Sequence, residues 1–267
     1  MRILQICNKP PYPPHEGGSI AIGTDGMPVV SFHYNTLSRL KLYHCTTSSC
    51  SSVDTAVDVY TGTHSGNYSS IAINSNGYPI ISNYDSSTQD LIVSSCANIG
   101  CSTGTTSTNL DSTGNVGAWT SIDIGVDGLP IISYEAVNTA LKIAHCTNTN
   151  CTAFNIVTLD STSDTGEGSS IVIGADGLPI VSYHEGSTSL NLKTTKCASI
   201  ACNETSGYYA SGGSNIGSPT KYFNNVYAVQ YWGKQYQIVK FADVAENYYV
   251  EVGLVPVILA RRVSFGE

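Results

Sequence analysis

The side chains most able to do chemistry recur at one position of four similar segments. Each lies two residues after a serine that ends a predicted strand. These residues are His33, Tyr84, Glu135 and His184. Imidazole and carboxylate groups that face one another can bind a metal ion or act as an acid and base pair. The next position adds Asp85 and Glu185, which could form a carboxylate pair. The alternative is that all six are solvent-facing residues at strand ends.

Eight of the nine cysteines form pairs with four residues between the partners. The pairs are Cys45 with Cys50, Cys96 with Cys101, Cys146 with Cys151, and Cys197 with Cys202. Opposed strand ends can bring two Cα atoms to the roughly 5.5 Å that a disulfide needs. We therefore expect four disulfides and an oxidising compartment, with Cys7 left unpaired. Reduced thiols and a zinc site stay open as alternatives, the latter because His44 and His145 each precede a paired cysteine.

Other catalytic and cofactor signals are missing from the sequence. It contains no G-x-S-x-G, H-E-x-x-H or phosphate-loop motif. Only Arg39 of the four arginines lies within the repeats, so the three converging arginines of a sialidase cannot form there. Asp25, Asp127 and Asp176 could bind Ca²⁺, but their positions in Asp-Gly turns explain them. We expect no cofactor.

Four repeats of about 50 residues carry these side chains. The repeats start at Ser19, Ser70, Ser121 and Ser170. Apolar and polar residues alternate in each, an Asp-Gly or Asn-Gly pair predicts a tight turn, and a proline begins the second strand. Four antiparallel strands per repeat predict an all-β protein, a β-propeller-like array of four four-stranded blades. An open β-solenoid stack is the alternative.

The repeat pattern S-I-x-I-G-x-D-G-x-P-[IV]-[IV]-S-Y, followed by C-x4-C, resembles the propeller-type repeats of bacterial secreted and surface proteins. It is similar, more distantly, to the blades of NHL-repeat proteins. The resemblance covers roughly residues 19–210. It implies a propeller that binds a ligand or a surface, and it brings no catalytic motif.

The two ends of the chain resemble other families. Residues 1–21 resemble the opening of a GT-B glycosyltransferase, with a strand followed by a Pro-then-Gly-Gly loop, and one extra strand is the alternative. Residues 226–262 resemble the start of the ribosomal large-subunit protein twenty-one family, whose Y-A-[VI] and G-K-Q-[YF]-x-[VI] motifs match Tyr227–Val229 and Gly233–Ile238. We therefore divide the chain into residues 1–18, the repeats of 19–215 and a β-rich segment of 216–267. That last segment is either a partial fifth blade or part of a mosaic chain.

Composition and charge reduce the number of functional classes that fit the sequence. Residues 1–220 hold 7 basic and 16 acidic side chains, a balance of −9 that disfavours nucleic-acid binding. No apolar run reaches the roughly 18 residues of a membrane span, and the five-residue stretch of Ile3–Cys7 is too short for a signal peptide. We predict a monomeric, non-enzymatic scaffold that binds glycan or protein at a surface, extracellular or on the cell surface. The alternatives are a hydrolase or lyase with a His/Glu site on the propeller face, and RNA or ribosome association through residues 221–267.

Overall fold

The computed structural model describes residues 18–34, 37–62, 64–161, 164–185 and 191–203, and the strand backbones of 221–231, 234–243 and 248–254. Regular structure in these residues is entirely β, in antiparallel sheets whose strands follow one another in chain order. The first sheet contains β1 (Gly18–Ile22), β2 (Pro28–Tyr34), β3 (Arg39–His44) and β4 (Val57–Tyr60). The second contains β5 (Asn67–Ile73), β6 (Pro79–Asp85), β7 (Asp90–Ser95) and β8 (Thr106–Asp111).

The third sheet contains β9 (Val116–Ile124), β10 (Pro130–Ala136), β11 (Ala140–Cys146) and β12 (Phe154–Asp160). The fourth contains β13 (Thr165–Ile173), β14 (Pro179–Glu185) and β15 (Asn191–Lys196). A C-terminal sheet contains β16 (Lys221–Tyr231), β17 (Lys234–Asp243) and β18 (Tyr248–Leu254). The predicted outer strand of the fourth blade falls after β15, where residues 204–220 lie outside the described part of the chain.

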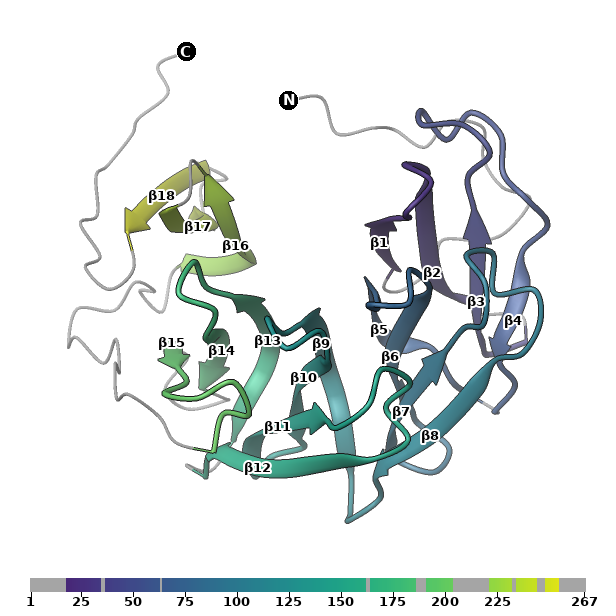
Figure 1. Cartoon of the computed structure of the whole chain (residues 1–267). Coiled ribbons are helices and arrows are strands. Elements are labelled where there is room, and N and C mark those ends of the chain that lie inside the picture. The colour runs from purple at the N-terminus through teal and green to yellow at the C-terminus, as the bar shows by residue number, and fades with distance from the viewer. Residues whose placement is uncertain are drawn as a thin grey trace.

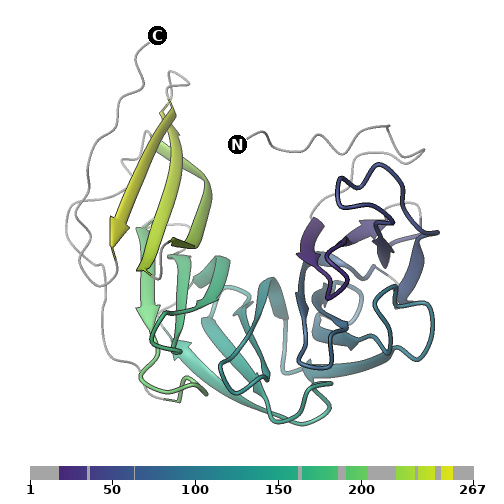
Figure 2. The ribbon, with the colours of Figure 1, turned by 45° about the horizontal axis from the view of Figure 1, so that its top comes forward.

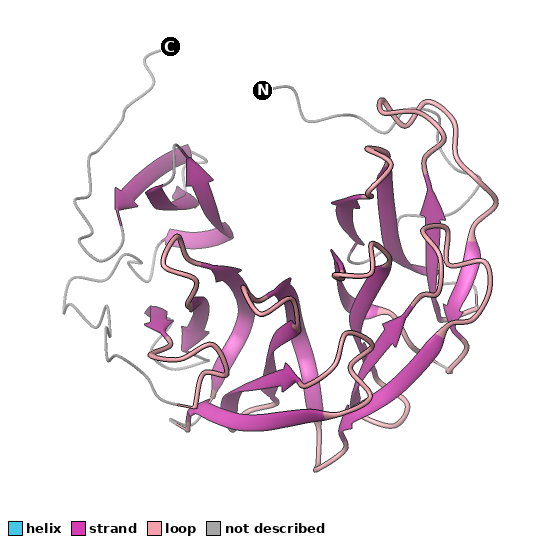
Figure 3. Ribbon diagram, in the orientation of Figure 1, coloured by secondary structure: helices cyan, strands magenta, loops and turns pink. Residues whose placement is uncertain are grey.

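The sheets are the blades of a propeller. Their first strands, β1, β5, β9 and β13, lie side by side along the inner edge, and the later strands fan outward (Figure 1). Figure 2 shows the same curved array, open between the first sheet and the β16–β18 sheet. Strands and loops alternate throughout the coloured parts of Figure 3. The predicted all-β, propeller-like array is therefore confirmed.

Repeated serines join each blade to the next. The hydroxyl of Ser19 accepts a hydrogen bond from the backbone N–H of Ile71 in the second blade at 3.2 Å. Ser70 and Ser121 accept the same bond from the following blades, also at 3.2 Å. Three further hydroxyl pairs cross the same interfaces: Ser31 with Ser69, Ser82 with Thr120, and Ser133 with Ser169. These bonds satisfy polar groups at the inner edge and explain why serine recurs in the repeat.

The apolar core lies between blades. Ile71, Ile122 and Ile171 follow the first serine of the second, third and fourth repeats, and each is 6% exposed. Ile71 belongs to a cluster with Leu40 and Leu42 of the preceding blade. Ile20 is the equivalent residue of the first repeat, and it is 57% exposed. Each blade thus covers the inner strand of the next one, whereas β1 forms an open edge.

A buried ion pair also crosses the interface between the second and third blades and that between the third and fourth. Asp111, the last residue of β8, accepts hydrogen bonds from the Tyr134 hydroxyl at 2.9 Å and from Lys142 Nζ at 2.9 Å, both in the third blade. Asp160 at the end of β12 does the same with Tyr183 and Lys193 of the fourth blade, at 2.8 and 3.2 Å. Each buried carboxylate is therefore neutralised across a blade boundary.

The four cysteine pairs are disulfides, as predicted, with Cα atoms 4.8–4.9 Å apart. They join Cys45 to Cys50, Cys96 to Cys101, Cys146 to Cys151 and Cys197 to Cys202. The disulfides leave no thiolate at these pairs for the alternative zinc site.

The expectation that opposed strand ends bring the cysteines together is wrong for the second partner of each pair. These partners lie in the loop after the third strand and outside any strand: Cys50, Cys101, Cys151 and Cys202. Each has a positive φ of 53–58°. Its backbone N–H donates to the carbonyl three residues earlier, at 2.9–3.1 Å. A tight turn with one left-handed residue therefore folds the chain back onto the first cysteine.

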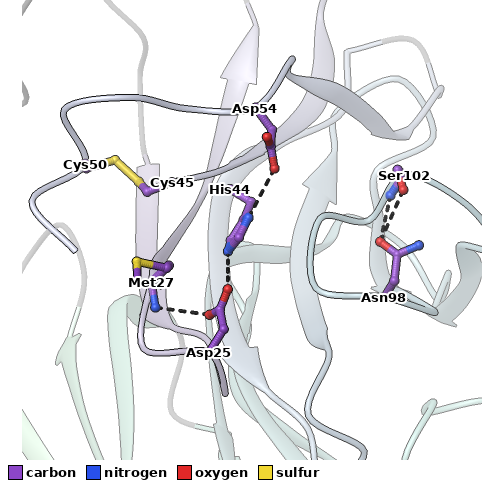
Figure 4. Close-up of polar contacts among 8 residues, drawn as sticks. All are labelled: Asp25, Met27, His44, Cys45, Cys50, Asp54, Asn98 and Ser102. Atoms are coloured by element: carbon purple, nitrogen blue, oxygen red, sulfur yellow. Dashed lines mark hydrogen bonds and ion pairs between the residues drawn. A yellow bond between two sulfur atoms is a disulfide. The ribbon is translucent and has the colours of Figure 1, made fainter. Parts of the chain in front are cut away.

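Polar side chains close the short loops between the bonded cysteines, as where Asn98 Oδ1 accepts the Ser102 N–H at 3.1 Å (Figure 4). Cys7, predicted to be unpaired, lies outside the described residues. Among the described residues, no helix is long and apolar enough to cross a membrane.

Candidate functional site

The four predicted site residues lie at one end of the array, where the second strand of each blade finishes. His33 is on β2, Tyr84 on β6, Glu135 on β10 and His184 on β14. The Asp-Gly turns and the disulfides lie at the opposite end of these strands, which we call the turn end. His33, Tyr84 and Glu135 are buried, and His184 is half-buried. The expectation of solvent-facing side chains therefore does not describe the first three.

Two aromatic side chains in tilted contact lie beside Tyr84. The ring centroids of Tyr68 and Trp119 are 4.5 Å apart, and those of Tyr68 and Tyr84 are 6.2 Å apart. Tyr68 is 37% exposed and Trp119 is half-buried, so part of the pair reaches solvent. The Tyr84 hydroxyl donates to Asn115 Oδ1 at 2.7 Å. We call Tyr68, Tyr84 and Trp119 the aromatic platform.

The backbone under this platform is unusual. Tyr68 and Trp119 precede the serine of their repeats by two residues, and their φ angles are +53° and +51°. The equivalent residue of the fourth repeat is Gly168, with a φ of +62°. Left-handed backbone is unfavourable for a bulky aromatic residue, and such outliers cluster at functional sites. Two aromatic side chains therefore occupy a position that favours glycine, where the first strand of each of these blades has a register shift.

Acidic side chains gather between the third and fourth blades at the same end. Burial raises the pKa of the Glu135 carboxyl above its ordinary value, the Asn138 N–H opposes this at 3.3 Å, and the charges of Glu167 and Asp164 raise it further. Glu167 forms an ion pair with His184 Nδ1 at 3.4 Å. The site thus combines a buried carboxyl group of raised pKa with the more exposed Glu167 carboxyl group, which contacts His184.

Glycine allows this close approach of the two blades. Gly166 has a φ of +113°, and a Cβ there would lie 3.2 Å from the Glu135 Cα. Gly66 plays the same part between the first two blades, where a Cβ would lie 3.3 Å from the His33 Cα. The positions of Glu135 and His33 therefore depend on glycine in the following blade.

The other predicted site residues lie in different blade interfaces. Asp85 is 1% exposed, and its Oδ1 accepts hydrogen bonds from the Ser87 N–H and hydroxyl. Glu185 forms an ion pair with Lys193 at 2.8 Å in the fourth blade. Asp85 and Glu185 thus lie in different blades, and His33, Tyr84, Glu135 and His184 each lie in a blade of their own.

The turn aspartates, considered above for Ca²⁺, have partners within their own blades. In the first blade, Asp25 Oδ1 accepts the Met27 N–H at 3.0 Å and Oδ2 lies 2.8 Å from His44 Nε2 (Figure 4). In the third blade His145 forms an ion pair with Asp127, and in the fourth blade Lys196 forms one with Asp176. No group of three or more His, Cys, Asp or Glu side chains suited to a metal ion occurs among the described residues.

Sequence reasoning missed the platform residues Tyr68 and Trp119 and the carboxylate of Glu167. A signal for the first two was present, because both lie two residues before the repeat's serine. Both lie just outside the S-I-x-I-G-x-D-G-x-P pattern that defines the repeat. Glu167 lies three residues before the serine of its repeat, where the first repeat has Glu16 but the second and third have Asn67 and Ala118, so the carboxylate recurs in only two of the four repeats.

Comparison with known proteins finds structures of similar fold. No protein-family model and no curated protein matches the sequence, so the GT-B, ribosomal and NHL resemblances have no support there. A Dyadobacter fermentans protein of unknown function matches with a TM-score of 0.64 and 10% identity over 90% of this chain and 76% of that one. An α-L-arabinofuranosidase from Clostridium thermocellum matches with a TM-score of 0.52 and 12% identity over 88% of both chains.

An endo-1,4-β-xylanase from Bacteroides thetaiotaomicron matches with a TM-score of 0.54 and 9% identity over 95% of this chain and 98% of that one. At such identities the likeness concerns the fold and leaves the reaction open. The chain is thus a β-propeller similar in fold to glycoside hydrolases.

Proposed function

We propose that this chain recognises a glycan at the end of the propeller that carries the aromatic platform. The observation that supports this most is the contacting pair of Tyr68 and Trp119, held in left-handed backbone and partly exposed. An aromatic face packs against the C–H face of a sugar ring, and a rigid ring loses little entropy on binding. Glu167, His184 and Asn115 supply polar groups near the same end.

Likeness in fold supports the same ligand class. The similar structures include an arabinofuranosidase, an endo-arabinase and a xylanase, all named for reactions on glycans. The four disulfides support action outside the cytosol, where such bonds persist. Both the enzymatic and the non-enzymatic interpretation of the propeller share a glycan ligand.

A second function, hydrolysis of the bound glycan, is favoured by Glu135. Its raised pKa suits a general acid that donates a proton to the glycosidic oxygen. Glu167, which contacts His184, would serve as the carboxylate that activates water or attacks the sugar. Two carboxyl groups in unlike environments are the arrangement that glycosidases use.

The test of binding uses two tyrosines of equal exposure. Tyr68 and Tyr78 are both 37% exposed, but Tyr78 lies at the turn end. We expect Tyr68→Ala to weaken binding of arabinan or xylan oligosaccharides at least tenfold, and Tyr78→Ala to leave it unchanged. Equal affinity of the two variants for a glycan that the wild-type protein binds would contradict the proposed location.

Glu135→Gln separates binding from cleavage. It keeps the shape of the side chain but cannot donate the proton. If the chain is a hydrolase, this variant should retain glycan affinity and lose release of reducing ends by a factor of at least a hundred. If the wild-type protein binds glycans and releases no reducing ends, the non-enzymatic interpretation holds.

A further inference from the structure

The interface between the first and second blades lacks the buried ion pair of the next two interfaces. Tyr60 ends β4 at the position that Asp111 and Asp160 occupy at the ends of β8 and β12. Ile92 replaces the lysine, because it lies on β7 where Lys142 lies on β11. This interface therefore has, at these two positions, neither the lysine ammonium group nor the carboxylate that the ammonium group neutralises in the other two interfaces.

Two other carboxylates are buried in this interface. Asp85 is 1% exposed and Asp90 is 8% exposed, and they lie directly opposite each other on β6 and β7. Directly opposed residues of an antiparallel pair have Cβ atoms about 4.5–5.5 Å apart. Within the described ranges, neither carboxylate forms an ion pair with a lysine, arginine or histidine. Two negative charges thus share a buried position without a basic partner, which is costly.

Neighbouring groups occupy some of the carboxylate oxygens. Asp90 Oδ2 accepts the Asn109 side-chain N–H at 2.7 Å. The Tyr60 hydroxyl is hydrogen-bonded to Asp85, and burial together with the charges of Asp85 and Asp90 raises its pKa, so Tyr60 stays protonated. These neutral groups orient the two carboxylates but do not balance their charge.

Asn83 adds an unsatisfied amide. It is fully buried, and neither its Oδ1 nor its Nδ2 has a hydrogen-bond partner. It lies two residues before Asp85 on β6, so both side chains project from the same face of the sheet. Leaving buried polar atoms unpaired costs about 1–3 kcal/mol each. A fully buried amide oxygen without a partner therefore lies on the same face of the sheet as the two carboxylates.

We propose that Asp85, Asp90 and the amide oxygen of Asn83 form a calcium site between the first and second blades. Carboxylate and carboxamide oxygens are ligands that Ca²⁺ prefers, and its flexible coordination tolerates a site that water completes. The ion replaces the lysine ammonium of the other interfaces as the positive charge. Gly62 of the first blade leaves space here, because a Cβ at this residue would collide with the Asp85 carboxylate.

Binding of calcium to the whole chain tests this site. A site with two carboxylates belongs with weak protein calcium sites, whose Kd is about 10⁻⁴–10⁻³ M. At about 10 mM calcium we expect a saturable heat of binding and a rise in Tm of several degrees relative to protein in chelator. Asp90→Asn should weaken calcium binding at least tenfold. Asp54→Asn removes the same charge from an exposed residue and should leave the affinity unchanged.

Two results would overturn the proposal. A wild-type protein with the same Tm in calcium and in chelator, and with no heat of binding, overturns the proposal. So does unchanged calcium affinity in Asp90→Asn. If Asp90→Asn does not fold, Asn83→Leu provides the second variant, since it fills the amide's volume and removes only the neutral ligand. We expect this variant to fold and to bind calcium at least threefold more weakly, and equal affinity would contradict the site.

Discussion

Removing Lys142 should destabilise the protein by leaving the Asp111 carboxylate buried without its partner. The Asp111 side chain is 4% exposed and that of Lys142 is 20% exposed. Breaking a fully buried pair costs about 3–5 kcal/mol, and the partial exposure of Lys142 lowers this to about 2–4 kcal/mol for Lys142→Met. The matched control is Arg39→Met, whose ion pair with Asp58 is 36% and 27% exposed and should contribute under about 1 kcal/mol.

The pH dependence of this loss follows from Asp111. Burial alone would raise its pKa, but hydrogen bonds from Lys142, the Thr113 N–H and Tyr134 outweigh burial and lower the pKa below its ordinary value. A lowered carboxyl pKa stabilises the fold above the unfolded-state pKa of about 3.9, and this contribution disappears as the pH falls through the folded-state pKa. The difference between wild type and Lys142→Met should therefore be full at neutral pH and shrink below about pH 4.

Urea unfolding followed by circular dichroism measures the free energies of both variants at neutral and acidic pH. The double variant Asp111→Asn with Lys142→Met should recover part of the loss, because the unpaired charge is gone. A Lys142→Met loss no larger than that of Arg39→Met would refute the buried pair. A loss that stays constant down to about pH 3 would refute its dependence on the Asp111 charge.

Three further experiments test the fold. Gly117→Ala should cost over about 2 kcal/mol of unfolding free energy, because the new Cβ would lie 2.7 Å from the Leu91 Cα. Gly114 is the control, since it has a similar φ but open space around it, and Gly114→Ala should cost only about 1 kcal/mol. Ile122→Ala should cost about 2–5 kcal/mol and Ile20→Ala under about 1 kcal/mol in the same urea assay, and equal costs would mean that the β1 edge is covered. Mass spectrometry before and after reduction should count four disulfides, each contributing about 2 kcal/mol or less because its loop is short.

The blade architecture could be predicted because each of its signals recurs. Asp-Gly turns, strand-starting prolines and C-x4-C pairs appear at the same offset in successive repeats, so one local interpretation is checked several times. The contacts between blades cannot be predicted from the sequence of a single repeat. Ser19 bonds the backbone of Ile71, and Asp111 bonds Lys142, only because successive repeats curve around a common inner edge.

The candidate site was only partly predictable for the same reason. Periodicity located Glu135 and His184, which the structure places at the same end of neighbouring blades. It could not show that burial raises the pKa of Glu135 or that Glu167 pairs with His184, since both depend on the packing of two blades. The RNA and glycosyltransferase interpretations concern residues whose side chains lie outside the described part of the chain, and monomeric state stays a prediction.

Tryptophan fluorescence tests the glycan site most directly. The chain has two tryptophans, so Trp232→Phe leaves Trp119 of the aromatic platform as the sole reporter. A sugar that stacks on the platform removes water from the indole and should shift its emission to shorter wavelength, saturating at the Kd measured by calorimetry. A glycan that binds this variant by calorimetry but leaves the Trp119 emission unchanged would contradict the account.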